Sequence, residues 1–270
     1  MTTDPLAQIE TWPAPHAAAG VTRAGEVVAL RGPVDEPFPL ASVTKLLTAL
    51  AVLVAVEEGT LALDDPAGPA GSTVEHLLAH ASGLGPDGDR MAAPGRRRIY
   101  SNAGFQVLGR LLAERAGMPV EDYVTEGVLH PLRMSSTKAS GSAAFGAVGS
   151  TADLLALGRE LLSPTLISPA MLARATATAF PGLNGVLPGF GRQDPNDWGL
   201  GFELRDRKSP HWTGETNSPR TFGHFGLSGT FLWVDPDAGL ACACVTDLEF
   251  GPWAAEVWPK LSDAVLAACR

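Results

Sequence analysis

Two residue types suited to acyl-transfer chemistry lie three positions apart, at Ser42 and Lys45. Ala, Leu and Val fill nearly every position over residues 46–56, a pattern that predicts a helix buried on all sides. Residues three apart lie side by side on a helix, so the lysine amine can contact the serine hydroxyl. Burial lowers the pKa of an amine, and a helix N-terminus favours negative charge. The pair is therefore a candidate nucleophile and base.

The Ser-x-x-Lys spacing is a weak pattern by itself, and a structural explanation stays open. Ser42 could simply cap the helix while Lys45 extends to solvent. A second copy, Ser135 with Lys138, follows a His-Pro-Leu turn and has no apolar run behind it. We expect that second pair to lie in a surface loop.

Two further motifs could supply the groups that such a serine needs. Residues 100–102 (Tyr-Ser-Asn) contain one of only two tyrosines in the chain. A phenol near a cationic lysine loses its proton more easily and can act as a general base. Residues 224–226 (His-Phe-Gly) precede an expected strand, and a glycine there lets a substrate approach the backbone closely. Taken singly, a core tyrosine and a structural histidine explain these motifs better.

Composition and charge narrow the class of protein. The 270 residues suffice for a large core in one or two domains, and the net charge of −9 argues against nucleic acid or an anionic membrane as partner. We recognise no signal peptide, transmembrane helix or lipidation motif, so the expected location is the cytoplasm. Cys242, Cys244 and Cys269 are expected to be free core residues in a reducing compartment.

Periodicity divides the chain into strand-rich ends and a helical middle. Besides the buried run, helices are predicted over residues 73–81, 102–116, 120–129, 151–162, 169–177 and 253–268. Strands are predicted over residues 17–23, 26–32, 198–204, 221–225, 229–235 and 240–247. The first 16 residues are expected to form an irregular strap or a short helix. We expect residues 1–60 and 195–270 to share one α/β sheet domain, with residues 61–194 inserted as a helical domain.

In this order and context, the three motifs resemble those of the serine β-lactamase and penicillin-binding-protein superfamily, on its class C side. That side also contains esterases and D-aminopeptidases. The resemblance covers about residues 20–265. Further similar segments are residues 75–84 (Glu-His-Leu-Leu-Ala-His-Ala-Ser-Gly-Leu), 94–95 (Pro-Gly), 131–134 (Pro-Leu-Arg-Met), 150–154 (Ser-Thr-Ala-Asp-Leu) and 198–202 (Trp-Gly-Leu-Gly-Phe).

The resemblance implies an α+β fold of the β-lactamase/transpeptidase type: an antiparallel sheet flanked by helices, with an inserted all-helical domain. It places the active site at the interface of the two domains. It also implies that Ser42 attacks a carbonyl group. Lys45 and Tyr100 would share the base role, and Tyr100 would protonate the leaving group. Asn102 would orient the lysine and the substrate. No metal or organic cofactor is required.

The third motif carries the remaining implied roles and one departure. The backbone N–H groups of Ser42 and of Leu227, which follows Gly226, would form an oxyanion hole. His224 stands where β-lactamases and transpeptidases usually have lysine. A histidine is mostly neutral at cytoplasmic pH and gains charge as the pH falls, so we expect uncharged esters or amides to be preferred over β-lactams. The arginines at 96–98 could instead supply a cation at the rim.

The expected function is a monomeric serine hydrolase that cleaves a small ester or amide through a Ser42 acyl-enzyme. A biosynthetic transacylase, which passes the acyl group to an amine or alcohol, would use identical residues and stays open. A penicillin-recognising β-lactamase or D,D-peptidase is a third reading, although the chain is short for the family. A non-catalytic binding module on the same fold is the fourth. The intact set of Ser42, Lys45, Tyr100 and Asn102 argues against the last.

Overall fold

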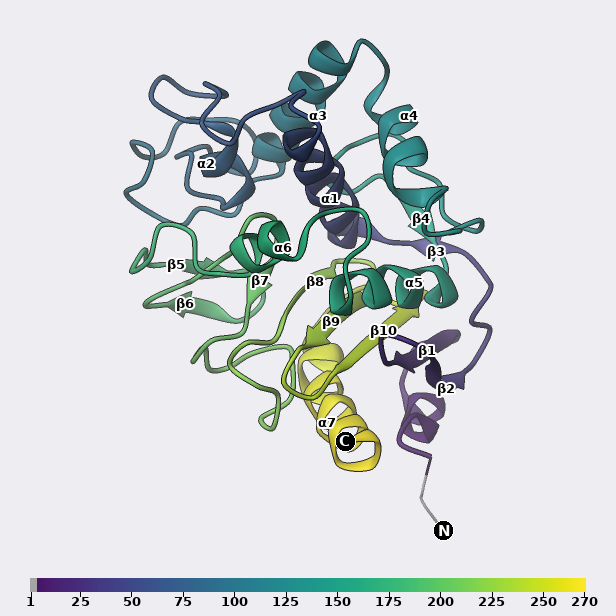
Figure 1. Ribbon diagram of the computed structural model, residues 1–270. Coiled ribbons are helices and arrows are strands. Elements are labelled where there is room, and N and C mark those ends of the chain that lie inside the picture. The colour runs from purple at the N-terminus through teal and green to yellow at the C-terminus, as the bar shows by residue number, and fades with distance from the viewer. Residues whose placement is uncertain (1–3) are drawn as a thin grey trace.

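A six-stranded antiparallel sheet forms the central layer of the computed structural model, which describes residues 4–270 (Figure 1). The strand order is β2-β1-β10-β9-β8-β7. Pairing of β1 with β10 joins the two ends of the chain in one sheet, as predicted from the sequence. The strands are β1 (Ala17–Thr22), β2 (Val27–Arg31), β7 (Glu203–Leu204), β8 (Phe222–Gly226), β9 (Thr230–Asp235) and β10 (Leu240–Thr246).

Helices cover both faces of this sheet. The helix α5 (Thr151–Leu162) packs on β1, β9 and β10, and α7 (Pro252–Cys269) lies across the opposite face (Figure 1). Alternation along β10 serves both cores, because Ala243 belongs to the cluster with α5 whereas Cys242 and Cys244 belong to the cluster with α7. The three cysteines are free and buried, as predicted.

The helix α1 (Thr44–Glu57) is the buried centre of the molecule, with residues 44–55 all buried. It contacts α3 (Asn102–Ala116), α4 (Val120–Val124) and the strand β8. Such a helix needs no polar face, which is why its sequence shows none. The bounds predicted for α3 and α5 agree with the structure. The helix predicted over 120–129 continues beyond α4 as wider turns, η3 (Thr125–Leu129).

Shorter elements complete the chain and include a hairpin that the sequence did not predict. The strap before β1 contains a single turn, although its residues 1–3 lie outside the described part. None of the helices within residues 4–270 has the length and apolar character needed to cross a membrane. The short elements are η1 (Ala7–Thr11), β3 (Phe38–Pro39), η2 (Ala41–Val43), α2 (Val74–Leu78), β4 (Val148–Gly149), α6 (Pro169–Ala175), β5 (Gly185–Leu187) and β6 (Gly191–Gln193).

The strand predicted over residues 198–204 was wrong for most of its length, since only β7 at its end pairs in the sheet. The backbone turns at Gly201, whose φ of +90° favours glycine. A side chain there would lie 2.2 Å from the Cβ of Ala49 on α1. The chain must therefore turn past the buried helix before it joins the sheet. The division into domains at 61–194 stays a prediction, and α5 from that stretch packs on the sheet.

Candidate active site

The turn η2 delivers Ser42 to the beginning of α1. The preceding residue, Ala41, has a φ of +43°, a left-handed conformation that costs free energy in a non-glycine residue. Ser42 is half-buried, and Lys45 one turn later is completely buried. The Lys45 Nζ lies 3.2 Å from the Ser42 Oγ. The spacing of the two residues thus produces the contact that the sequence predicted.

The Lys45 amine is held by uncharged groups. Besides Ser42, it donates hydrogen bonds to the Asn102 Oδ1 at 2.7 Å and to the Ala144 carbonyl oxygen at 2.8 Å. Burial disfavours the ammonium form and lowers the pKa of Lys45 to about 7. Near neutral pH, a large fraction of these molecules therefore carries a free amine that can accept a proton.

Tyr100 lies against the same hydroxyl. Its Oη donates to the Ser42 Oγ at 2.7 Å, and its ring centroid is 4.8 Å from the Lys45 Nζ. The sequence argument expected a phenol that loses its proton easily. Burial instead raises the pKa of Tyr100 above its ordinary value, and the Ser42 hydrogen bond offsets only part of that. Tyr100 is consequently a neutral phenol at physiological pH, and Lys45 is the group beside Ser42 that can accept a proton there.

A capped helix start and a buried histidine fix the segment that carries Tyr100. The Ser101 Oγ accepts from the Gly104 N–H and so caps α3, which begins at Asn102. The Ser101 N–H donates to the His80 Nδ1 at 3.1 Å, and the His80 ring packs against the Tyr100 ring at 4.7 Å between centroids, with a 44° tilt. In the sequence, His80 stood out only as part of a family-like segment. The structure shows that it supports the segment carrying Tyr100.

His224 lies in β8 with its ring buried beside Tyr100, at 5.8 Å between ring centroids. Its Nδ1 is 2.6 Å from the Phe225 carbonyl oxygen, which can only accept, so Nδ1 carries the proton. Burial, reinforced by the nearby Lys45, lowers the pKa of His224 to about 3. From the sequence, His224 was expected to gain charge as the pH falls from 8 to 5.5. That expectation is wrong, because the buried ring stays neutral over this range.

The end of β8 packs tightly against the segment that carries Ser42. A Cβ at Gly226 would lie 2.5 Å from the Leu40 carbonyl oxygen and 3.1 Å from the Ala41 Cβ, so only glycine fits. The Thr230 Oγ1 donates to the same Leu40 oxygen at 3.0 Å. Leu227 follows directly, with its side chain 60% exposed. The backbone at Leu227 is therefore held beside the start of α1.

A cavity of about 330 Å³ opens next to Ser42. Lys45 and Gly226 reach the site through their contacts with Ser42 and with residues 40–41. Five of the seven predicted site residues line the cavity itself: Ser42, Tyr100, Asn102, His224 and Leu227.

Sequence reasoning missed the remaining walls of the cavity. They come from the tip of the β5–β6 hairpin, residues 187–189, and from Trp198, Glu203, Phe225 and Phe250. Trp198 lies in a segment already quoted as family-like, and Glu203 is the single acidic residue within the strand expected over 198–204. The hairpin tip and Phe250 carried no signal, because only the folded chain brings them to Ser42.

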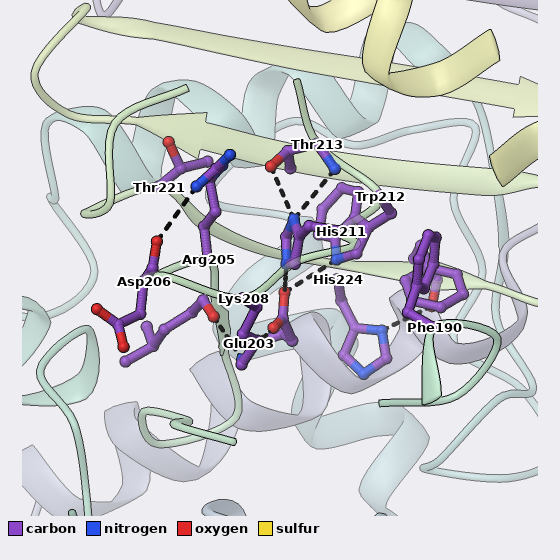
Figure 2. A network of polar contacts seen from close by, with 12 residues as sticks. Phe190, Glu203, Arg205, Asp206, Lys208, His211, Trp212, Thr213, Thr221 and His224 are labelled. Carbon is purple, nitrogen blue, oxygen red and sulfur yellow. Dashed lines mark hydrogen bonds and ion pairs between the residues drawn. The ribbon is translucent and has the colours of Figure 1, made fainter. Parts of the chain in front are cut away.

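Glu203 lines the cavity, but its carboxylate is fully engaged by the loop that follows β7 (Figure 2). One oxygen accepts from the Lys208 ammonium, and the other accepts from the His211 Nε2 at 2.8 Å and the Trp212 Nε1 at 2.9 Å. Burial alone would raise the pKa of Glu203, yet the charges of His211 and Lys208 and their hydrogen bonds lower it to about 2. This carboxylate is structural and is not available to a substrate.

The arginines weighed as an alternative cation do not line the cavity. Arg98 is buried and donates to backbone carbonyls, among them those of Asn196 at 3.0 Å and Ala179 at 2.7 Å. Arg96 and Arg97 are exposed. The second Ser-x-x-Lys pair, at 135 and 138, is exposed as well, so its prediction as a surface loop is confirmed.

This fold and arrangement define the class of protein. The family model named Beta-lactamase matches residues 9–266, and the chain therefore belongs to the β-lactamase family. Its fold is the one that serine hydrolases and acyltransferases of this family share. The predicted α+β fold is confirmed.

Individual relatives sharpen this placement. A solved structure of a β-lactamase from Mycobacterium bovis is 54% identical to this chain, covers 97% of it and 98% of its own length, and superposes with a TM-score of 0.96. Penicillin-binding protein 4* of Bacillus subtilis (strain 168) is 27% identical over 37% of this chain and 30% of its own length. The D-alanyl-D-alanine-carboxypeptidase/endopeptidase AmpH of Escherichia coli (strain K12) is 29% identical over 44% of this chain and 40% of its own length. The matches to these last two thus span less than half of either relative.

Proposed function

We propose that the protein is a serine hydrolase that cleaves a small ester or amide through an acyl-enzyme on Ser42. One observation carries the proposal: the Ser42 Oγ is hydrogen-bonded both to the Tyr100 Oη at 2.7 Å and to the Lys45 Nζ at 3.2 Å. A hydroxyl becomes a nucleophile when an adjacent base can take its proton. Here the base is an amine whose pKa burial has brought to about 7.

Acylation then proceeds as follows. The Ser42 oxygen attacks the substrate carbonyl carbon while its proton moves to the neutral Lys45 amine, directly or through the Tyr100 hydroxyl. The carbonyl oxygen gains negative charge, which the backbone N–H groups of Ser42 and Leu227 stabilise. When the tetrahedral intermediate collapses, the leaving group takes the phenolic proton of Tyr100, and the Lys45 ammonium restores it. The amine is neutral again, so the protons balance.

Deacylation reverses these proton transfers with water as the nucleophile. Water gives a proton to Lys45, through Tyr100, as its oxygen attacks the acyl carbon. The intermediate expels the Ser42 oxygen, which regains a proton from the same relay. Asn102 keeps the lysine in place throughout, since its Oδ1 accepts from the Nζ.

Active-site labelling tests the proposal. A fluorophosphonate should add one label per molecule in intact-mass spectrometry, and peptide mapping should place it on Ser42. The variant Ser42→Ala should take no label, whereas Ser135→Ala, the matched control at the exposed second pair, should be labelled like the wild type. A label that persists in Ser42→Ala would contradict the proposed acyl-enzyme on Ser42. Product analysis with and without an added amine or alcohol separates hydrolysis from acyl transfer.

Hydrolysis of β-lactams is the second candidate, because the 54% identical Mycobacterium bovis protein is called a β-lactamase. A β-lactam carries a carboxylate, and the neutral, buried His224 offers it no fixed charge. We therefore expect kcat/KM for the β-lactam nitrocefin to be lower than kcat/KM for an uncharged p-nitrophenyl ester. The opposite order would make the β-lactamase reaction the better assignment.

A further inference from the structure

Three separate loops build one apolar wall around the cavity. Leu187 ends the strand β5, Pro188 and Gly189 form the hairpin tip, Leu227 follows β8, and Phe250 precedes α7. These segments are distant in sequence, so their convergence is a property of the fold. Figure 1 shows the β5–β6 hairpin beside the β7–β8 edge of the sheet.

The parts of this wall are packed directly on one another. A Cβ at Gly189 would lie 2.5 Å from a ring carbon of Phe250, so the backbone of the hairpin tip packs closely against that ring. The Phe250 N–H donates to the Leu227 carbonyl oxygen at 2.7 Å, and the Phe250 ring is 4.9 Å from the Phe225 ring. The wall has a defined shape, and the side chains at 187 and 250 set its size.

The same cavity offers no unpaired charge to a substrate. None of its lining residues is a lysine or arginine within the described chain, residues 4–270. The Glu203 carboxylate is occupied by Lys208, His211 and Trp212 (Figure 2). His224 holds its Nδ1 proton on the Phe225 carbonyl oxygen, as the neutral ring does. A charged group placed here would be desolvated without compensation.

We infer that this cavity binds the acyl group of the substrate and selects a short, uncharged, apolar chain. The inference rests on the proposed acyl-enzyme and names its substrate class. The acyl part is assigned to the cavity because it stays bonded to Ser42 after the leaving group departs, and the cavity encloses that position. At about 330 Å³, the cavity lies at the small end of the roughly 300–1,000 Å³ typical of ligand pockets, so the length of chain that it can hold is limited.

A series of p-nitrophenyl esters tests the inference. The acyl chain is lengthened from acetate to decanoate, and a matched set carries a terminal carboxylate. Each methylene that the cavity buries should raise kcat/KM by about fourfold until the cavity is full, after which kcat/KM should fall. The carboxylated partner of the best ester should be at least tenfold poorer. A flat profile, or a preference for the carboxylated set, would overturn the inference.

Two neighbouring residues of β5 provide a matched pair of variants. Leu187 is fully buried and lines the cavity, whereas Val186 is 57% exposed and faces solvent. Leu187→Ala should move the optimum to longer acyl chains, and Val186→Ala should leave the profile unchanged. Phe250→Trp, which narrows the same wall, should move the optimum to shorter chains and keeps the test available if Leu187→Ala does not fold. Circular dichroism and thermal melting report folding of each variant.

Fluorophosphonate labelling separates this inference from the function on which it rests. If Ser42 takes no label, the proposed function fails, and the inference about the acyl group is overturned with it. If Ser42 is labelled but the optimum follows the alcohol chain in a second ester series, the acyl assignment is overturned while the acyl-enzyme stands. An unchanged profile in both Leu187→Ala and Phe250→Trp would likewise overturn the assignment of the cavity wall.

Discussion

Two lysines are buried in this protein in opposite electrostatic settings. Lys45, at the start of α1, donates only to uncharged partners: Ser42, Asn102 and the Ala144 carbonyl. Lys208, in the loop after β7, is 4% exposed and donates to the Glu203 carboxylate. Burial lowers the pKa of both amines, but the charge and hydrogen bond of Glu203 oppose that effect at Lys208.

The difference between Lys45 and Lys208 suits one buried lysine to the proposed chemistry and the other to stability. An amine without an ionised partner can release its proton near pH 7 and act as a base. An ammonium paired with a buried carboxylate keeps its proton, and removal of either partner leaves an uncompensated charge. The contacts of Glu203 with Lys208, His211 and Trp212 therefore fix a wall of the cavity, whereas Lys45 is available for the proton transfers that we propose.

The largest expected effect is on catalysis at Lys45. Lys45→Met removes the amine that would accept the Ser42 proton, so the acylation rate should fall by about 10²–10⁴-fold, the usual contribution of a general base. Burst kinetics with a p-nitrophenyl ester, normalised to folded protein, measure this rate. A variant that still acylates within a few-fold of the wild type would assign the base role elsewhere.

The reciprocal change at Lys208 should act on stability. Lys208→Met leaves the Glu203 carboxylate buried with the donors His211 and Trp212 but without the ammonium that pairs with it. Breaking such a pair costs about 3–5 kcal/mol of unfolding free energy. Urea unfolding measures this loss, and the acylation rate per folded molecule should stay near the wild-type value. Adding Glu203→Gln should recover part of the stability. Equal stability of wild type and Lys208→Met would show that the ion pair contributes nothing.

A double variant shows whether Tyr100 belongs with Lys45. Because both contact the Ser42 Oγ, Tyr100→Phe should slow acylation strongly, and the combination with Lys45→Met should lose little more than the worse single change. Single-turnover kinetics of the two single variants and the double variant provide the cycle. Additive losses in free energy would mean that only one of them takes part in proton transfer.

The smallest expected effect concerns His224 and pH. Since the pKa of His224 is lowered to about 3, the ring stays neutral from pH 8 down to 5.5. The preference for an uncharged ester over its carboxylated partner should therefore be constant over this range. The rate itself should rise with pH through about 7, as Lys45 loses its proton. A preference that narrows steadily as the pH falls would show that His224 gains charge after all.

Much of this arrangement was predictable from the sequence because it depends on local spacing. The Ser42–Lys45 contact follows from helix geometry, and the bounds of α3 follow from its Ser101 cap and the glycine at 117. The joining of both chain ends in one sheet followed from strand patterns at each end. The Ser42–Lys45 contact, the helix bounds and the strand patterns are each encoded within a short stretch of residues.

The features that the sequence could not predict depend on burial and on distant contacts. The protonation state of Tyr100 is set by the groups that cover it, not by its neighbours in the chain. The hairpin tip at 187–189 meets Phe250 only in the folded protein. Similarly, the sequence predicted Glu203 only as part of a strand. The residues of the following loop that donate hydrogen bonds to its carboxylate are known only from the structure.

The most direct test of the contrast between the two lysines is an NMR titration. The chain has only four lysines, so ¹³Cε labelling gives four signals, and Lys138→Arg and Lys260→Arg identify the two exposed ones. The signal of Lys45 should titrate with a midpoint near pH 7, while that of Lys208 should remain in the ammonium form there. A Lys45 midpoint near the ordinary lysine value of about 10.4 would contradict the account, because the site would then lack its base.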